Sequence, residues 1–211
     1  MRRVFAALVT ALAVGALGAC SSDGPARASS SKADLNDNPV VGRYDGFGLI
    51  PPQPRPSFTL TDTSGAPYSF AVRTAKRPTL LFFGYTHCPD VCPTTMADIA
   101  QALRQVPDAL RARVAVVFVT TDVKRDTGPV IRAWLNQFDG GLPNRFVGLT
   151  GSQLQVDAAQ AAAHIQLAED DGKQHSADVV LYGADDYARV KFLQSTNQAE
   201  QIAHDLPLVA A

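Results

Sequence analysis

Two largely apolar runs stand out in the pattern of hydrophobic and polar positions, at residues 79–84 and 114–119. Runs of this length without alternation are typical of strands that are buried on both faces of a sheet. After the first run, Met96, Ile99 and Leu103 recur at the spacing of one helix face. The chain is therefore predicted to alternate buried strands with helices.

The remaining pattern continues this alternation. Alternating positions on both sides of a turn at residues 62–65 predict a hairpin, with strands near residues 58–60 and 68–72. The later predictions are a helix over 126–138, a strand over 146–149, a helix over 152–164, strands over 177–182 and 188–193, and a helix over 197–205. This order predicts an α/β fold with a thioredoxin-like central sheet, flanking helices and an added N-terminal hairpin.

The amino-terminal end has the features of an export signal. Arg2 and Arg3 precede an apolar stretch over residues 4–17, which is shorter than the roughly 20 residues that span a bilayer. The stretch ends in Leu-Gly-Ala-Cys at Cys20, which resembles the lipobox of bacterial lipoproteins. We predict that residues 1–19 are a signal peptide and that a lipid on Cys20 anchors the protein at the extracytoplasmic face of the bacterial cell membrane. An ordinary cleaved signal or an uncleaved anchor is the alternative.

The segment after Cys20 lacks hydrophobic periodicity. Residues 21–38 are rich in Ser, Asp, Gly and Ala, and residues 51–56 are rich in proline. These compositions favour a flexible tether followed by a stiff, extended approach. We predict that residues 20–55 are the lipidated cysteine and its tether, and that residues 56–211 are the folded domain.

Composition limits the classes of partner. At 211 residues, with 46% hydrophobic residues, the chain can bury the core of one compact domain. The formal net charge is -1, and lysine and arginine do not gather in one segment. Because phosphate binding needs a clustered basic surface, we do not expect nucleic acid as a partner.

The mature domain is expected to hold two cysteines, Cys88 and Cys92, because Cys20 is used by the lipid. Outside the cytoplasm, two nearby thiols either oxidise to a disulfide or hold a metal. A bridge between residues four positions apart would close too small a loop to be a good structural staple. The pair is therefore predicted to serve chemistry.

The surroundings of the two cysteines favour thiolates. They follow a buried strand and open a predicted helix, with Pro93 suited to its first turn. The partial positive charge of a helix N-terminus lowers thiol pKa values. Two thiolates from one turn can bind one soft ion, Cu(I) or Zn(II), and an added imidazole also suits Cu(II). Two buried structural cysteines, a zinc site and a redox dithiol remain open, although the second cysteine pair common in structural zinc sites is missing.

Four segments together resemble the SCO/SenC copper proteins. Residues 83–93, Phe-Gly-Tyr-Thr-His-Cys-Pro-Asp-Val-Cys-Pro, are similar to the signature of that family. Residues 121–127 resemble its Asp-Pro-x-Arg-Asp-Thr segment, with valine where proline is common, and residues 149–152 resemble its Leu-Thr-Gly turn. His175 precedes a predicted strand, as the distal histidine of the family does. The resemblance covers residues 56–205 and keeps the same order and spacing.

Members of that family assist assembly of the binuclear copper centre of cytochrome c oxidase. The resemblance therefore implies that Cys88, Cys92 and His175 bind copper, as Cu(I), Cu(II) or both. It also implies the copper-bearing subunit of the oxidase as a client, and a copper donor that the sequence does not identify. Only the resemblance selects His175 from the four histidines of the chain.

Further polar residues are expected around the ligands. His87 precedes the first cysteine, Asp90 lies between the two, and Asp122 follows a buried strand whose end should lie beside the cysteine turn. We predict that these side chains support the site from outside the ligand set. For Asp122, contact with a partner protein, a turn role and a helix cap are alternatives. Arg125 and Asp126 are predicted to form a local surface charge pair, which is worth little energetically.

Three functions follow from this chemistry. The leading interpretation is a copper metallochaperone, which is not a turnover enzyme. The alternatives are a thiol–disulfide oxidoreductase that acts on the client's copper-ligand cysteines, and a peroxiredoxin-like peroxidase of the same fold. Against the peroxidase, Tyr85 stands three residues before Cys88, where threonine would be expected. Metal transfer and disulfide exchange use the same two sulfurs, so the first two functions are not exclusive.

Overall fold

The computed structural model of the protein describes residues 42–170 and 172–211. The predicted signal peptide, the lipidation of Cys20 and the predicted tether up to residue 41 lie outside these residues. Within the described part, no helix has the length and apolar character needed to cross a membrane.

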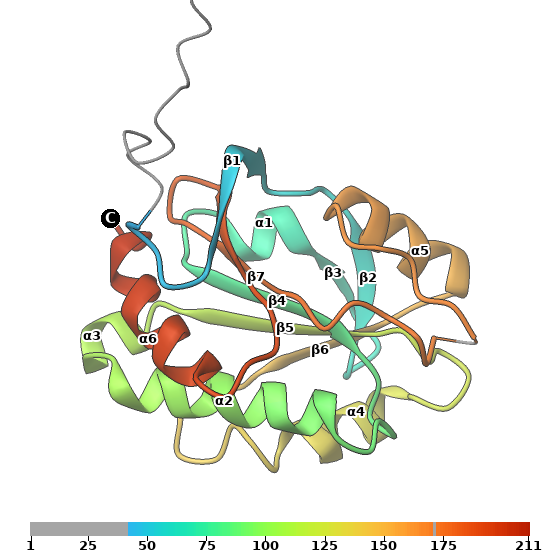
Figure 1. The fold of residues 1–211 in the computed structure, drawn as a ribbon. Helices are drawn as coiled ribbons and strands as arrows, with labels where there is room; N and C mark the ends of the chain where they lie inside the picture. The colour runs from blue at the N-terminus through green and yellow to red at the C-terminus, as the bar shows by residue number, and fades with distance from the viewer. Residues whose placement is uncertain (1–41, 171) are drawn as a thin grey trace, which may run out of the picture. The chain divides into compact units, whose positions relative to one another are not determined.

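One mixed sheet of eight strands forms the centre of the described domain, in the order β1-β8-β7-β4-β5-β6-β2-β3 (Figure 1). The strands are β1 (Phe47–Pro54), β2 (Thr59–Asp62), β3 (Pro67–Ser69), β4 (Thr79–Gly84), β5 (Ala115–Thr120), β6 (Val147–Thr150), β7 (Val179–Tyr182) and β8 (Tyr187–Phe192). The helices are α1 (Phe70–Thr74), α2 (Val91–Gln105), α3 (Asp108–Arg111), α4 (Gly128–Leu135), α5 (Gln153–Ala162) and α6 (Gln198–Leu208). The pairs β4–β5 and β5–β6 are parallel, and the other pairs are antiparallel.

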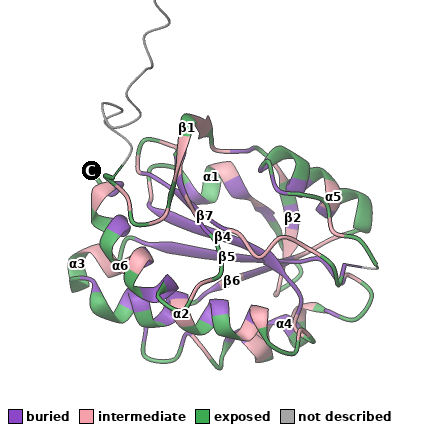
Figure 2. Ribbon diagram, in the orientation of Figure 1, coloured by how far each residue is buried: buried purple, intermediate pink, exposed green. Residues whose placement is uncertain are grey.

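Helices cover both faces of this sheet and give three layers. Leu80 and Phe82 of β4 lie in a core with α2, α4 and α6, whereas Leu81 and Phe83 lie in a second core with α1 and α5. The division follows from the two-residue period of a strand, which sends neighbouring side chains to opposite faces. Since both faces are covered, every residue of β4 and β5 is buried, as predicted (Figure 2). The predicted thioredoxin-like α/β fold is confirmed.

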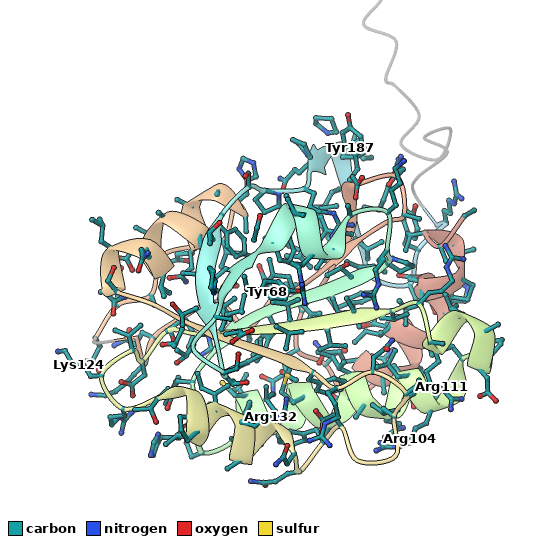
Figure 3. The ribbon with its side chains drawn as sticks, turned by 180° about the vertical axis from the view of Figure 1, so that it is seen from behind. Tyr68, Arg104, Arg111, Lys124, Arg132 and Tyr187 are labelled. Carbon is teal, nitrogen blue, oxygen red and sulfur yellow. The ribbon has the colours of Figure 1, made fainter. Side chains whose placement is uncertain are left out.

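Three arginines on the α2 side of the sheet bind backbone carbonyls through their guanidinium groups. Arg104 and Arg111 donate to carbonyls at or after the ends of α4 and α2, and Arg132 donates to the Phe146 carbonyl just before β6. Figure 3 shows them on the side of α2, α3 and α4, opposite Tyr187. These contacts fasten the helix layer to the loops that follow it.

The predicted N-terminal hairpin is present, but its second strand is shorter than expected. β2 and β3 pair antiparallel, and β2 also pairs with β6. The return strand was predicted to reach Val72, whereas the chain turns into α1 at Phe70. Phe70 and Thr74 are both buried and Val72 is exposed, and burial four positions apart is the spacing of a helix rather than of a strand.

The folded domain begins earlier than predicted. Residues 47–54, which the sequence analysis placed in the tether, form β1 and pair with β8, so that prediction is wrong for them. Proline is tolerated here because β1 is an edge strand. The register also shifts between Gly48 and Gln53, where the two consecutive prolines of the strand lie. A proline-rich segment therefore forms part of the sheet.

Arg55 fastens this edge of the sheet from inside the fold. Its side chain is only 3% exposed, and it donates to the Asp186 carboxylate, the Thr74 hydroxyl and the Gly183 carbonyl, each at 2.9 Å. The guanidinium carbon lies 5.0 Å from the centre of the Tyr182 ring. Arg55 was also predicted to belong to the tether, whereas in the structure its side chain is buried against the folded domain.

Candidate metal centre

The two cysteines lie beyond the carboxyl end of β4, in the turn that leads into α2. β4 ends at Gly84 and α2 begins at Val91. Cys88 lies in the turn, and its N–H donates to the Tyr85 carbonyl at 3.3 Å. Cys92 occupies the second position of α2 and is fully buried, whereas Cys88 is partly exposed, and both are free thiols. The strand–turn–helix placement predicted for the pair is therefore present.

His175 reaches the cysteines from the loop between α5 and β7. Its Nε2 lies 3.6 Å from Cys92 Sγ, although the residues are 83 positions apart. The His175 ring packs edge-on against Tyr85, with 5.5 Å between ring centres, and against Phe82 at 6.3 Å. The structure therefore brings the histidine selected by the resemblance to the buried cysteine.

The neighbours of His175 determine which nitrogen faces the sulfur. Its Nδ1 lies 2.9 Å from the Ser176 carbonyl, which can only accept a hydrogen bond. Nδ1 therefore carries the proton, and Nε2 presents a lone pair to Cys92. Burial lowers the pKa of His175, against the opposing effect of the Ser176 carbonyl. The imidazole is thus held neutral and oriented as a ligand would be.

The two thiols differ in acidity. Burial alone would raise the pKa of Cys88, but hydrogen bonds from the N–H groups of Cys92 and Asp90 outweigh it and lower the pKa. The Cys92 N–H lies 3.3 Å from Cys88 Sγ. Burial strongly raises the pKa of Cys92. Cys88 is therefore the accessible and more acidic thiol, and Cys92 is the buried and less acidic thiol beside His175.

We expect Cys88 to react with iodoacetamide at least about tenfold faster than Cys92 in the reduced, metal-free protein. Because its pKa is lowered, Cys88 should also begin to react at a lower pH than an unperturbed thiol does. Peptide mapping by mass spectrometry after timed labelling measures both rates. Equal rates, or faster labelling of Cys92, would contradict this assignment.

Gly84 provides the space for the buried sulfur. A Cβ atom at this position would lie 2.9 Å from Cys92 Sγ and 2.9 Å from the Phe82 ring. Contacts this short require the neighbours to move, so only glycine lets Cys92 pack against the end of β4. No role was predicted for Gly84 from the sequence, although a glycine that closes an apolar run directly before the cysteines was the signal.

Asp126 ties the cysteine turn to the end of β5. It is fully buried, and its Oδ2 accepts from the Thr86 N–H at 2.8 Å and the Thr120 hydroxyl at 2.6 Å. Its Oδ1 accepts from the Thr86 hydroxyl at 2.6 Å and lies 3.2 Å from His87 Nδ1. The predicted surface pair between Arg125 and Asp126 is therefore wrong. Arg125 pairs with Asp122 instead, because the Asp126 side chain turns inward.

The residues predicted to support the ligands act in different ways. His87 is half-exposed, and its Nδ1 contacts the Asp126 carboxylate. Asp90 precedes α2 with an exposed side chain, and it reaches Cys88 through its backbone N–H. Asp122 is buried, and its carboxylate is engaged by Arg125. Of these, Asp90 has the direct contact with a cysteine.

Cys92 and His175 are spaced to bind one soft ion together, although the described side chains do not gather into a three-residue ligand set. In residues 42–170 and 172–211, no group of three or more His, Cys, Asp or Glu side chains is gathered closely enough to hold a metal. A separation of 3.6 Å between Cys92 Sγ and His175 Nε2 suits one ion bound to both, since such bonds are about 2.3 and 2.0 Å long for zinc. Two sulfurs and one imidazole nitrogen are also donors that copper accepts. The three-residue ligand set stays a prediction.

The fold and these residues define a class of protein: a thioredoxin-like domain with a dithiol at a helix N-terminus and a histidine beside it. Within this class, the SCO1/SenC family model matches residues 51–210. The chain therefore belongs to the SCO1/SenC family.

Individual relatives agree with this membership. A putative copper-binding protein of Stutzerimonas stutzeri is 33% identical over 146 residues, which cover 65% of this chain and 69% of that protein. Protein SenC of Rhodobacter capsulatus is 38% identical over 120 residues, or 56% of this chain and half of SenC. The copper-bound structure of Bradyrhizobium japonicum ScoI matches with a TM-score of 0.61 and 28% identity, covering 74% of this chain and 98% of that one.

Proposed function

We propose that this protein is a copper-binding metallochaperone that helps to assemble the binuclear copper centre of cytochrome c oxidase. The observation that carries the proposal is the 3.6 Å contact between Cys92 Sγ and His175 Nε2, next to a second thiol of lowered pKa. Membership of the SCO1/SenC family supports it. So do the relatives, one named as a copper-binding protein and one solved with copper bound.

Copper is the cargo in this proposal, and Cys88, Cys92 and His175 would hold it. Two thiolates satisfy Cu(I), and the imidazole adds the donor that favours Cu(II). Cys88 is the accessible member of the set, so an incoming ligand of the client can approach the ion from its side. Buried Cys92 and partly buried His175 would retain the ion until that ligand arrives.

The proposed client is the copper-bearing subunit of the oxidase, and a separate donor would load the copper. The proposed location is the extracytoplasmic face of the bacterial membrane, with a lipid on Cys20. The apolar segment that ends in Leu-Gly-Ala-Cys supports this location.

A thiol–disulfide oxidoreductase is the second candidate, and the asymmetry of the thiols favours it. An accessible thiol of lowered pKa beside a buried one is the arrangement of an attacking and a resolving cysteine. Cys88 and Cys92 would form a disulfide while the client disulfide gains two electrons and two protons. The peroxidase alternative has no comparable support, since Tyr85 packs against His175.

Replacing His175 separates the two candidates. The copper-loaded wild type should metallate the reduced binuclear-copper domain of an oxidase subunit. His175→Ala should deliver at least about tenfold less, because a ligand has been removed. Dithiol exchange needs only the cysteines, so both proteins should reduce the disulfide-bonded client equally. Copper optical bands and thiol counts follow the two reactions.

His204→Ala is the matched control, since His204 is a half-exposed histidine of α6 that pairs with Asp205 rather than with a cysteine. It should transfer copper like the wild type. Full metallation by His175→Ala, or reduction of the client by the wild type without copper transfer, would favour the oxidoreductase.

A further inference from the structure

The loop that carries His175 has little regular structure of its own. It joins α5 to β7, and its turn is closed by two backbone hydrogen bonds between Glu169 and Gln174, at 2.7 and 3.2 Å. At its far end, Asp178 pairs with Lys191 at 2.8 Å. The position of His175 between these points therefore depends on how the loop is held against the sheet.

Thr121 holds this loop from the end of β5. It is fully buried, and its hydroxyl lies 2.6 Å from the Gly172 carbonyl and 3.2 Å from the Gly84 carbonyl. The Gly84 carbonyl already accepts the Thr121 N–H at 2.7 Å. Because a hydroxyl has one proton and Gly172 offers the closer acceptor, the side chain of Thr121 donates to the loop.

Gly172, on the loop side of this contact, lies too close to Thr121 to carry a side chain. A Cβ atom on Gly172 would lie 2.0 Å from the Thr121 carbonyl oxygen. Gly172 also has a φ of +87°, a conformation that residues with side chains rarely adopt. Gly172, three residues before His175, thus lets the loop backbone lie directly on the backbone of Thr121. We call the Thr121–Gly172 contact the loop latch.

We propose that the loop latch positions His175 and thereby sets how strongly the site prefers Cu(II) over Cu(I). The inference rests on the proposed copper function. Two thiolates from one turn satisfy Cu(I), so its binding needs the histidine less. Cu(II) gains from the imidazole, and a loop already ordered by the latch loses less conformational entropy when Nε2 binds. Thr121 is in this sense a positioning residue.

Thr121→Val tests the latch, because valine keeps the shape of the side chain and removes the hydroxyl. Cu(II) affinity should fall by about tenfold or more, the usual effect of losing a group that orients a ligand. The nitrogen signature in the Cu(II) electron paramagnetic resonance spectrum should weaken with it. Cu(I) affinity should change by less than about threefold, which is well below the loss expected for Cu(II). Thr121→Ser should restore the wild-type values, and Gly172→Ala should reproduce the loss.

The matched control is Thr79→Val, since Thr79 is a fully buried threonine of β4 whose hydroxyl donates to the Arg77 carbonyl. It should leave both copper affinities unchanged. Hydrogen exchange of the amides of residues 172–178 in the metal-free protein tests the latch without copper, and it should be faster in Thr121→Val.

Unchanged Cu(II) affinity in Thr121→Val would overturn the inference. So would a parallel loss of both copper states and of thermal stability without rescue by serine, because that pattern marks a structural role alone. Absence of copper binding by the wild type would instead remove the proposed function. The hydrogen exchange would then still show whether Thr121 orders the loop.

Discussion

In a copper-competition titration of the reduced protein, Cys92→Ser is expected to lose tight binding of both Cu(I) and Cu(II). The loss of affinity should exceed about 100-fold, which is the largest usual effect of replacing a residue that only orients a metal ligand. Cys92 Sγ contacts His175 Nε2 and packs against Gly84 at the end of β4. Its removal therefore takes away the ligand that lies between the histidine and the sheet. Serine keeps the size of the side chain but is a hard donor that does not ionise at neutral pH.

Cys88→Ser should also lose tight Cu(I) binding, but it should keep weak Cu(II) binding through Cys92 and His175. Metal analysis after dialysis and chelator competition would measure both variants. Met96→Leu is the matched control, because Met96 is a second buried sulfur of α2, one turn beyond Cys92. It should bind copper like the wild type. Tight stoichiometric copper in Cys92→Ser would show that the ion lies elsewhere.

The central strands could be predicted from the sequence because their side chains form short, nearly continuous apolar runs. β4 and β5 are apolar except for one threonine each, and such near-continuous apolar runs are typical of strands that are buried on both faces. β1 was missed because its consecutive prolines resemble a linker, and only its place at the edge of the sheet allows them. Proline composition alone does not distinguish an edge strand from a tether.

Only those site residues that are close together in the sequence could be placed from the sequence pattern. Cys88 and Cys92 share one turn and were placed from their spacing. His175 comes from 83 residues away, and the sheet topology brings it to the cysteines. β7 runs antiparallel to β4, with Val179 paired to Phe82, so the loop before β7 lies where β4 ends. Without that pairing, only the family resemblance pointed to His175.

Asp126 was misassigned for a related reason. Charge patterning considers neighbours in sequence, and Arg125 is its neighbour. Its partners instead come from two places in the fold: Thr120 ends β5, and Thr86 lies in the turn after β4. Since β4 and β5 are parallel, their carboxyl ends meet, and a buried carboxylate between them can bind both.

Asp126→Asn is expected to lower the free energy of unfolding by about 2–4 kcal/mol, since each buried polar group left unsatisfied costs about 1–3 kcal/mol. Three donors converge on the two carboxylate oxygens, two from Thr86 and one from Thr120. An amide offers one accepting oxygen and places an NH₂ group against the remaining donors. For a chain of this size, the corresponding fall in Tm is about 5 to 15 °C.

The same substitution should reach Cys88, because Asp126 fixes Thr86 at the start of the cysteine turn. A looser turn weakens the N–H contacts that lower the pKa of Cys88, so its alkylation should shift to higher pH. Asp122→Asn is the matched control: its carboxylate is also buried in this loop but pairs with the half-exposed Arg125. The control should cost less than about 1 kcal/mol and leave the alkylation profile unchanged, in keeping with a partly solvated ion pair. If Asp126→Asn unfolds like the wild type and Cys88 reacts at the same pH, then the buried carboxylate does not hold the turn, and the geometry of Cys88 depends on α2 alone.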